Sequence, residues 1–395
     1  MRHGVFRRFI FARSLSQMGG WMQVVAAGWL IYKLTGSAAA VGVLAPLQKI
    51  PTIVGTPIGG GLADRYDRRR LAIRTLSLQV IPPALLALLA LDHELHAYEI
   101  YALVFLGAIP SAVTSPVLNE LAPHLVPEPI QHPAVADAAV AFNVARTIGP
   151  VIGGGLVVAI GVPIAFAVNA LSFVVVIVML QTLPHEHAQR GRLGRRGTLS
   201  FRAAARAVLR RPLVRVVLIT VLAFFVYVAP IQQLMPVISA EHADGAGLLG
   251  VFLSALAIGG ISANPLVRRL IDRGTPALLM VGAAVSLSGL LMIALALSHD
   301  PVLDWVVLFF VGGTWELLWV TAWSTAHFRS PEGLSGEAMG LLFMTSSLGL
   351  TVGALALGQL FDAFGVEDAL LGIGCVVLAF GVIPALVGRR VSDPA

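Results

Sequence analysis

Long apolar stretches alternate with short polar connections along the whole chain. A membrane-spanning helix needs about 20 mostly apolar residues. Because lipid offers the backbone no hydrogen-bond partner, stretches of this length are expected to be helical. The pattern therefore predicts an all-α membrane protein with twelve transmembrane helices. We place them at residues 9–33, 38–62, 71–91, 98–121, 138–160, 162–182, 213–238, 246–269, 276–298, 302–326, 337–361 and 366–388. In the seventh stretch, Pro230 and Pro236 are expected to kink the helix beside Gln232 and Gln233.

Composition supports the membrane assignment. Hydrophobic residues make up 57% of the 395 positions and charged residues 12%, whereas soluble domains carry roughly 25% charged residues. Lys and Arg residues also gather in every second connection, on one side of the membrane. With the N-terminus inside, 24 of the 27 Lys and Arg residues fall in inner segments, and the outer connections are acidic instead. Such asymmetry predicts cytoplasmic termini in a bacterial inner membrane. The net charge of +6 is then a topology signal rather than a sign of nucleic-acid binding.

A long inner connection divides six spans from six. It predicts three parts: residues 1–183 as an N-terminal six-helix bundle, 184–212 as a cytoplasmic basic linker, and 213–395 as a C-terminal six-helix bundle. Within the linker, Phe201, Ala205 and Val208 recur at helical spacing, with Arg202 and Arg206 on another face. We expect an amphipathic helix that rests on lipids of the inner leaflet. The alternative is an exposed linker helix with no specific lipid partner.

A charged motif follows the second span. It has the frame Gly-x-x-x-Asp-Arg-x-x-Arg-Arg, and a shorter Asp-Arg pair follows the eighth span. Its residues are Gly60, Asp64, Arg65, Arg68 and Arg69, and the second pair is Asp272 and Arg273. The motif resembles the signature loop of the major facilitator superfamily, although Asp67 replaces the usual glycine. The resemblance implies two six-helix pseudo-repeats and a gate in which Asp64 stabilises the outward-open form. The alternative is a determinant of topology made of positive charge.

A second motif lies in the fifth span. Gly149, Pro150, Gly153 and Gly154 form a Gly-Pro-x-x-Gly-Gly pattern, similar to one common in exporters of this superfamily. Proline bends a helix and glycine permits close helix contact, so the pattern predicts a flexible, tightly packed seam. The surrounding sequence is most similar to the branch of macrolide, multidrug and siderophore exporters.

Three ionisable residues lie deep within spans: Lys49, Arg146 and Glu316. A charge at the bilayer centre costs at least about 2.5 kcal/mol, so each is a candidate for function. On a helical wheel, Glu316 shares one face with three tryptophans, a suitable surface for a cation with an apolar body. The tryptophans are Trp315, Trp319 and Trp323. The alternative is that they pack on neighbouring helices or lipid.

The two cations allow opposite interpretations. Arg146 could neutralise an acid across the cavity or attract an anionic ligand. The alternative is a structural ion pair. Lys49 also needs a partner. Asn143, Gln232 and Gln233 add uncharged hydrogen-bonding groups that serve either a ligand or contacts between helices.

These features together predict a secondary transporter that exports small amphipathic molecules in exchange for protons, with two rocking halves. Spans one and four lack the mid-span acid and arginine frequent in related proton antiporters. Coupling therefore rests on Glu316 and on Asp137. A lipid flippase of the same fold and, less favoured, a non-transporting sensor are the alternatives. The sequence holds no nucleotide-binding loop and no metal-ligand spacing, so we expect no cofactor and no enzymatic activity. We also expect the protein to be a monomer.

Overall fold

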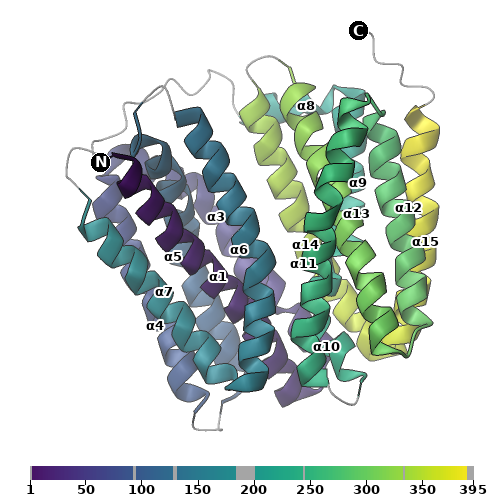
Figure 1. Ribbon diagram of the computed structural model, residues 1–395, viewed down its shortest axis with the longest axis horizontal. Coiled ribbons are helices and arrows are strands. Elements are labelled where there is room, and N and C mark those ends of the chain that lie inside the picture. Colours follow the sequence, from purple (N-terminus) through teal and green to yellow (C-terminus); the bar gives the residue numbers. More distant parts are fainter. Residues whose placement is uncertain are drawn as a thin grey trace. The chain divides into compact units, whose positions relative to one another are not determined.

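The computed structural model describes residues 2–91, 95–127, 131–183, 201–242, 245–331 and 334–388. Within these ranges the chain forms helices joined by short turns, and no strand occurs. Figure 1 shows the long helices of each half running side by side. The helices of the first half are α1 (Arg2–Thr35), α2 (Ala38–Gly42), α3 (Leu44–Arg65), α4 (Arg68–Leu89), α5 (Ala97–His124), α6 (Gln131–Ala159) and α7 (Val162–Gln181).

The second half begins with a short helix and a broken one. Its elements are α8 (Phe201–Leu209), α9 (Pro212–Tyr227), the 3₁₀ helix η3 (Ala229–Gln232), α10 (Met235–Ala240), α11 (Gly245–Asp272), α12 (Ala277–Ala296), α13 (Pro301–Phe328), α14 (Ser335–Phe364) and α15 (Val366–Gly388). Helix α8 confirms the helix predicted in the linker, whose residues 184–200 lie outside the described part.

Eleven helices of the described part are long and apolar enough to cross a membrane. Each corresponds to one predicted stretch. The remaining stretch, residues 9–33, lies in α1, a helix of 34 residues. Arg7, Arg8 and Arg13 lie in the first half of α1. The predicted all-α membrane fold is confirmed.

The seventh span is broken where its prolines predict. Helix α9 ends at Tyr227, and η3 and α10 each carry a proline in their first turn, Pro230 and Pro236. Proline has no amide hydrogen to donate to the preceding turn, so the chain restarts a helix at each one. Gln232 and Gln233 lie at this break and are half-buried.

The chain divides into two compact units. The first comprises Met1–Gly36 and Pro46–Arg196, and the second comprises Ser37–Ala45 and Gly197–Ala395. In the first unit, α1 packs on α6 and α7, and α4 packs on α5 and α7. Phe9, Leu76, Leu121 and Leu180 are fully buried in its core. In the second unit the main pairs are α12 with α15, α11 with α13, and α9 with α14. The sequence did not predict that residues 37–45 belong with the second unit.

Candidate functional site

Aromatic rings from three helices of the second unit meet in an aromatic cluster, which comprises Phe224, Phe225, Trp315, Trp319 and Phe343. Trp315 of α13 makes edge-on contacts with Phe224 and Phe225 of α9, with ring centroids 5.7 and 5.6 Å apart. Trp319, one turn later, lies 5.8 Å from Phe225 and 5.6 Å from Phe343 of α14. Edge-to-face geometry of this kind is the favourable arrangement for aromatic pairs.

Glu316 lies on α13 between the two clustered tryptophans and is half-buried. Its neighbours Thr314 and Leu318 are buried against other helices of the unit. Trp323 takes no part in the cluster, since it is 42% exposed and stacks on His327 with a centroid distance of 5.8 Å. On α13, Glu316 directly follows Trp315 and precedes Trp319 by three residues, whereas Trp323 lies outside the cluster. Sequence reasoning missed Phe224, Phe225 and Phe343, because nothing in a single-chain pattern reveals which helices meet.

The first unit contains two cationic side chains within its predicted spans, whereas the second unit contains the aromatic cluster. Lys49 of α3 lies within electrostatic reach of Arg146 of α6, and both residues are half-buried. Two neighbouring cations in an apolar protein favour an anion near them. Asn143 lies on α6, and its side chain falls outside the described part.

The predicted seam is a close contact between α6 and α1. A Cβ atom added to Gly149 would lie 2.8 Å from the Cβ of Trp21, and one added to Gly153 would lie 2.8 Å from the Cα of Met22. Pro150 and Gly154 are buried in the same stretch. Close approach of two backbones requires small residues here.

An equivalent contact in the second unit was not predicted. A Cβ added to Gly349 of α14 would lie 2.8 Å from the Cβ of Phe225, and one at Gly353 would lie 2.2 Å from the carbonyl oxygen of Val226. The signal in the sequence is the same Gly-x-x-x-Gly spacing in the eleventh span as in the fifth.

The charged motif after α3 is tied into the first unit by its later residues. Asp67 caps α4 by accepting a 2.8 Å hydrogen bond from the amide of Arg70. Arg68 pairs with Glu120 of α5 at 3.0 Å. Arg69 donates to the carbonyl oxygens of Leu180 and Gln181 at the end of α7, at 2.7 and 2.5 Å.

The other motif residues are placed less fully. Gly60, Asp64 and Arg65 lie in the last turns of α3, and the side chains of Asp64 and Arg65 fall outside the described part. In the second copy, Asp272 ends α11 and Arg273 follows it, both exposed.

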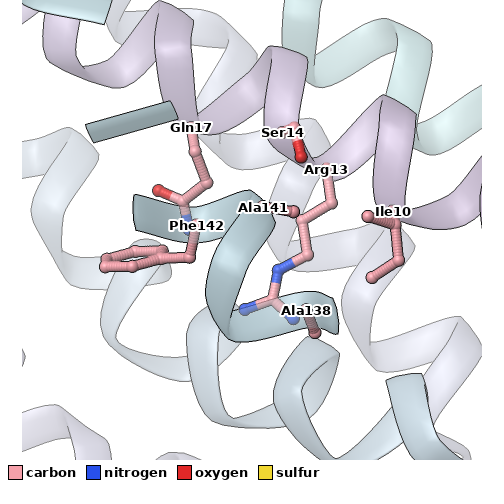
Figure 2. A pocket seen from close by; sticks show the side chains of 7 residues that line it. All are labelled: Ile10, Arg13, Ser14, Gln17, Ala138, Ala141 and Phe142. Atoms are coloured by element: carbon pink, nitrogen blue, oxygen red, sulfur yellow. The ribbon is translucent and has the colours of Figure 1, made fainter. Parts of the chain in front are cut away.

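A shallow recess lies between α1 and α6 (Figure 2). The side chain of Arg13 lies in it, across from Phe142 and Ala138. The guanidinium of Arg13 also donates a hydrogen bond to Asn119 of α5. The other residues that line the recess are Ile10, Ser14, Gln17 and Ala141. Sequence reasoning did not single out this recess.

A buried acid near the start of α13 was also missed. Asp304 is 2% exposed and its Oδ2 lies 2.8 Å from Nε2 of His242, in the segment after α10. The pair holds that segment against α13. Groups of three or more metal-ligating side chains do not occur among the described residues.

Two units of long apolar helices, with polar and aromatic groups inside them, define a polytopic membrane protein of the major facilitator type. The chain belongs to the transmembrane secretion effector family of that superfamily, whose family model matches residues 1–393. Members of this family are transporters rather than enzymes.

Three curated relatives are drug or siderophore transporters. The chain is 24% identical over 366 residues to the enterobactin exporter EntS of Citrobacter koseri, covering 91% of this chain and 85% of that one. It is 26% identical over 274 residues to macrolide efflux protein A of Streptococcus pyogenes, covering 65% and 66%. With the staphyloferrin A transporter of Staphylococcus aureus it is 24% identical over 176 residues, and the match spans 44% of each chain, less than half of that relative.

Solved structures agree on the fold. A crystal structure of a peptide transporter matches 98% of this chain and 94% of its own, with a TM-score of 0.77 and 13% identity. At this identity the likeness concerns the fold alone.

Proposed function

We propose that this protein is a secondary transporter that exports small amphipathic molecules in exchange for protons, by alternating access. Its place is the bacterial inner membrane, with both termini in the cytoplasm. The family and its relatives, a macrolide efflux protein and an enterobactin exporter among them, support export of small molecules of the drug or siderophore kind.

The observation that carries the proposal is Glu316 beside the aromatic cluster. Aromatic faces bind apolar and cationic bodies, and a carboxylate next to them binds either a cation or a proton. A substrate and a proton then compete for Glu316. Competition of this kind couples the two fluxes, because a proton entering from outside displaces substrate and proton release inside restores the site.

The cations of the first unit broaden the substrate class. Lys49 and Arg146 are suited to an anionic group, whereas the aromatic cluster is suited to an apolar body. The basic linker helix α8 is proposed to rest on anionic headgroups of the inner leaflet.

The test uses proteoliposomes with an imposed pH gradient, screened with cationic dyes, macrolides, siderophores and lysolipids. Glu316→Gln keeps the shape of the side chain but cannot ionise. We expect it to retain downhill exchange and to lose uphill transport. Glu367→Gln, an exposed acid paired with His299 at 3.4 Å, is the matched control and should pump as the wild type does.

Uphill transport by Glu316→Gln at the wild-type rate would remove Glu316 as the coupling residue. Arg146 and Asp137 would then be the next pair to test. Movement of lysolipids alone would identify a flippase rather than an exporter of soluble compounds.

A further inference from the structure

The last turn of α14 binds the first turn of α2 through one carboxylate. Oδ1 of Asp362 accepts a 2.7 Å hydrogen bond from the amide of Ala38. Oδ2 accepts a 2.6 Å bond from Oγ of Ser37 and a 3.0 Å bond from the amide of Ala39. A negative charge at the N-terminus of a helix is favourable, and hydrogen bonds to an ionised acceptor are stronger than neutral ones.

Close packing accompanies these bonds. Ala38 and Val41 of α2 are each 1% exposed. A Cβ on Gly42 would lie 2.2 Å from the carbonyl oxygen of Ala354, and one on Gly358 would lie 2.6 Å from the carbonyl oxygen of Ala38. The backbones of α2 and α14 therefore touch through glycines, while Asp362 holds the end of the contact.

The docked segment is short and is joined to the rest of the chain at two bends. Before it, Gly36 has φ of +63°, a left-handed conformation that favours glycine and ends α1. After it, the turn at Val43 leads into α3, which passes from the second unit to the first between Ala45 and Pro46. By its contacts the segment Ser37–Ala45 belongs to the second unit, although the chain on both sides belongs to the first.

We propose that Asp362 is a gating residue: with Ser37 and the first amides of α2 it forms a latch that closes the outer ends of spans two and eleven. The proposal rests on the proposed function, since alternating access requires α2 to leave α14 when the outer side opens. The resemblance to the superfamily's signature loop implied a gate at Asp64, at the inner end of span two. Asp362 is here assigned a gate at the opposite end of that span.

Opening of the latch is measured at Val41, which α14 covers. In a Cys375→Ser background, Val41→Cys is treated with a membrane-impermeant maleimide from outside. The labelling rate reports how often α2 leaves α14. With Asp362 intact we expect slow labelling. Asp362→Asn should raise the rate roughly tenfold, the effect of losing one charge-assisted hydrogen bond. Ser37→Ala should raise it less, and Asp362→Glu should restore part of the protection.

Asp368→Asn is the matched control, because Asp368 is an exposed acid in the first turn of α15. It should leave the labelling rate unchanged. Equal rates with and without Asp362 would overturn the proposal, and so would a complete lack of labelling in every variant, which would make the contact a permanent joint. The milder Ser37→Ala variant decides the matter if Asp362→Asn fails to reach the membrane. The measurement needs no substrate, so it stands apart from the transport assay.

Discussion

The two units share a packing device and differ in their polar contents. In each unit a Gly-x-x-x-Gly pair allows one helix to pack closely against the unit's first long helix. Gly149 and Gly153 of α6 contact α1, and Gly349 and Gly353 of α14 contact α9. The first unit carries Lys49, Arg146 and Arg13, whereas the second carries Glu316 and the aromatic cluster. A repeated frame is expected of a transporter whose halves move alike. The unequal side chains give each unit a different polar chemistry.

The largest expected effect comes from placing a bulky side chain in the close helix contacts at the Gly-x-x-x-Gly pairs. Gly353→Leu forces a side chain into the carbonyl of Val226, 2.2 Å from the added Cβ, whereas at Gly153 the nearest atom is 2.8 Å away. Overpacking costs about 1–3 kcal/mol or more. We expect Gly353→Leu to lower thermal stability and abolish transport, and Gly153→Leu to slow transport with a smaller loss of stability.

The measurements are the melting temperature in detergent and initial flux at matched expression. Gly155, whose added Cβ would meet no atom within 4 Å, supplies the control Gly155→Leu. Wild-type behaviour of both seam variants would show that the repeated spacing has no part in packing or cycling.

A smaller effect is expected from the rings. Trp319→Leu keeps apolar bulk but removes the ring beside Phe225 and Phe343. For a cationic substrate we expect KM to rise on the order of tenfold, the contribution of a partly desolvated cation–π contact. Trp323→Leu is the matched control, because Trp323 lies apart from the cluster. Equal KM values for the two variants would separate the cluster from the substrate site.

The smallest effect concerns the side-chain cap of α4 in the first unit. Asp67→Ala removes the acceptor for the amide of Arg70 and should cost about 1 kcal/mol of stability. Asp67→Asn keeps a capping oxygen and should restore most of it. The melting temperatures of the three proteins decide this, and a loss in the Asn variant equal to that in the Ala variant would mean that charge, not capping, matters at this position.

Sequence alone predicted the spans and the break in span seven, because apolar length and proline chemistry are local properties. It also predicted the seam at Gly149 and Gly153 as a packing surface. It did not predict that Arg68 and Arg69 bind Glu120 and the end of α7, since these partners are distant in the chain. The rings that meet Trp315 were missed for the same reason.

The placement of residues 37–45 has a consequence for any attempt to divide the protein. A cut in the central connection yields two polypeptides that follow the sequence halves, yet the second lacks a helix that belongs to its own unit. Its α14 would then present Gly358, Ala354 and the carboxylate of Asp362 without the backbone that covers them. Co-expression of the two pieces, rather than either fragment by itself, is therefore the sound route to split reporters and half-molecule complementation.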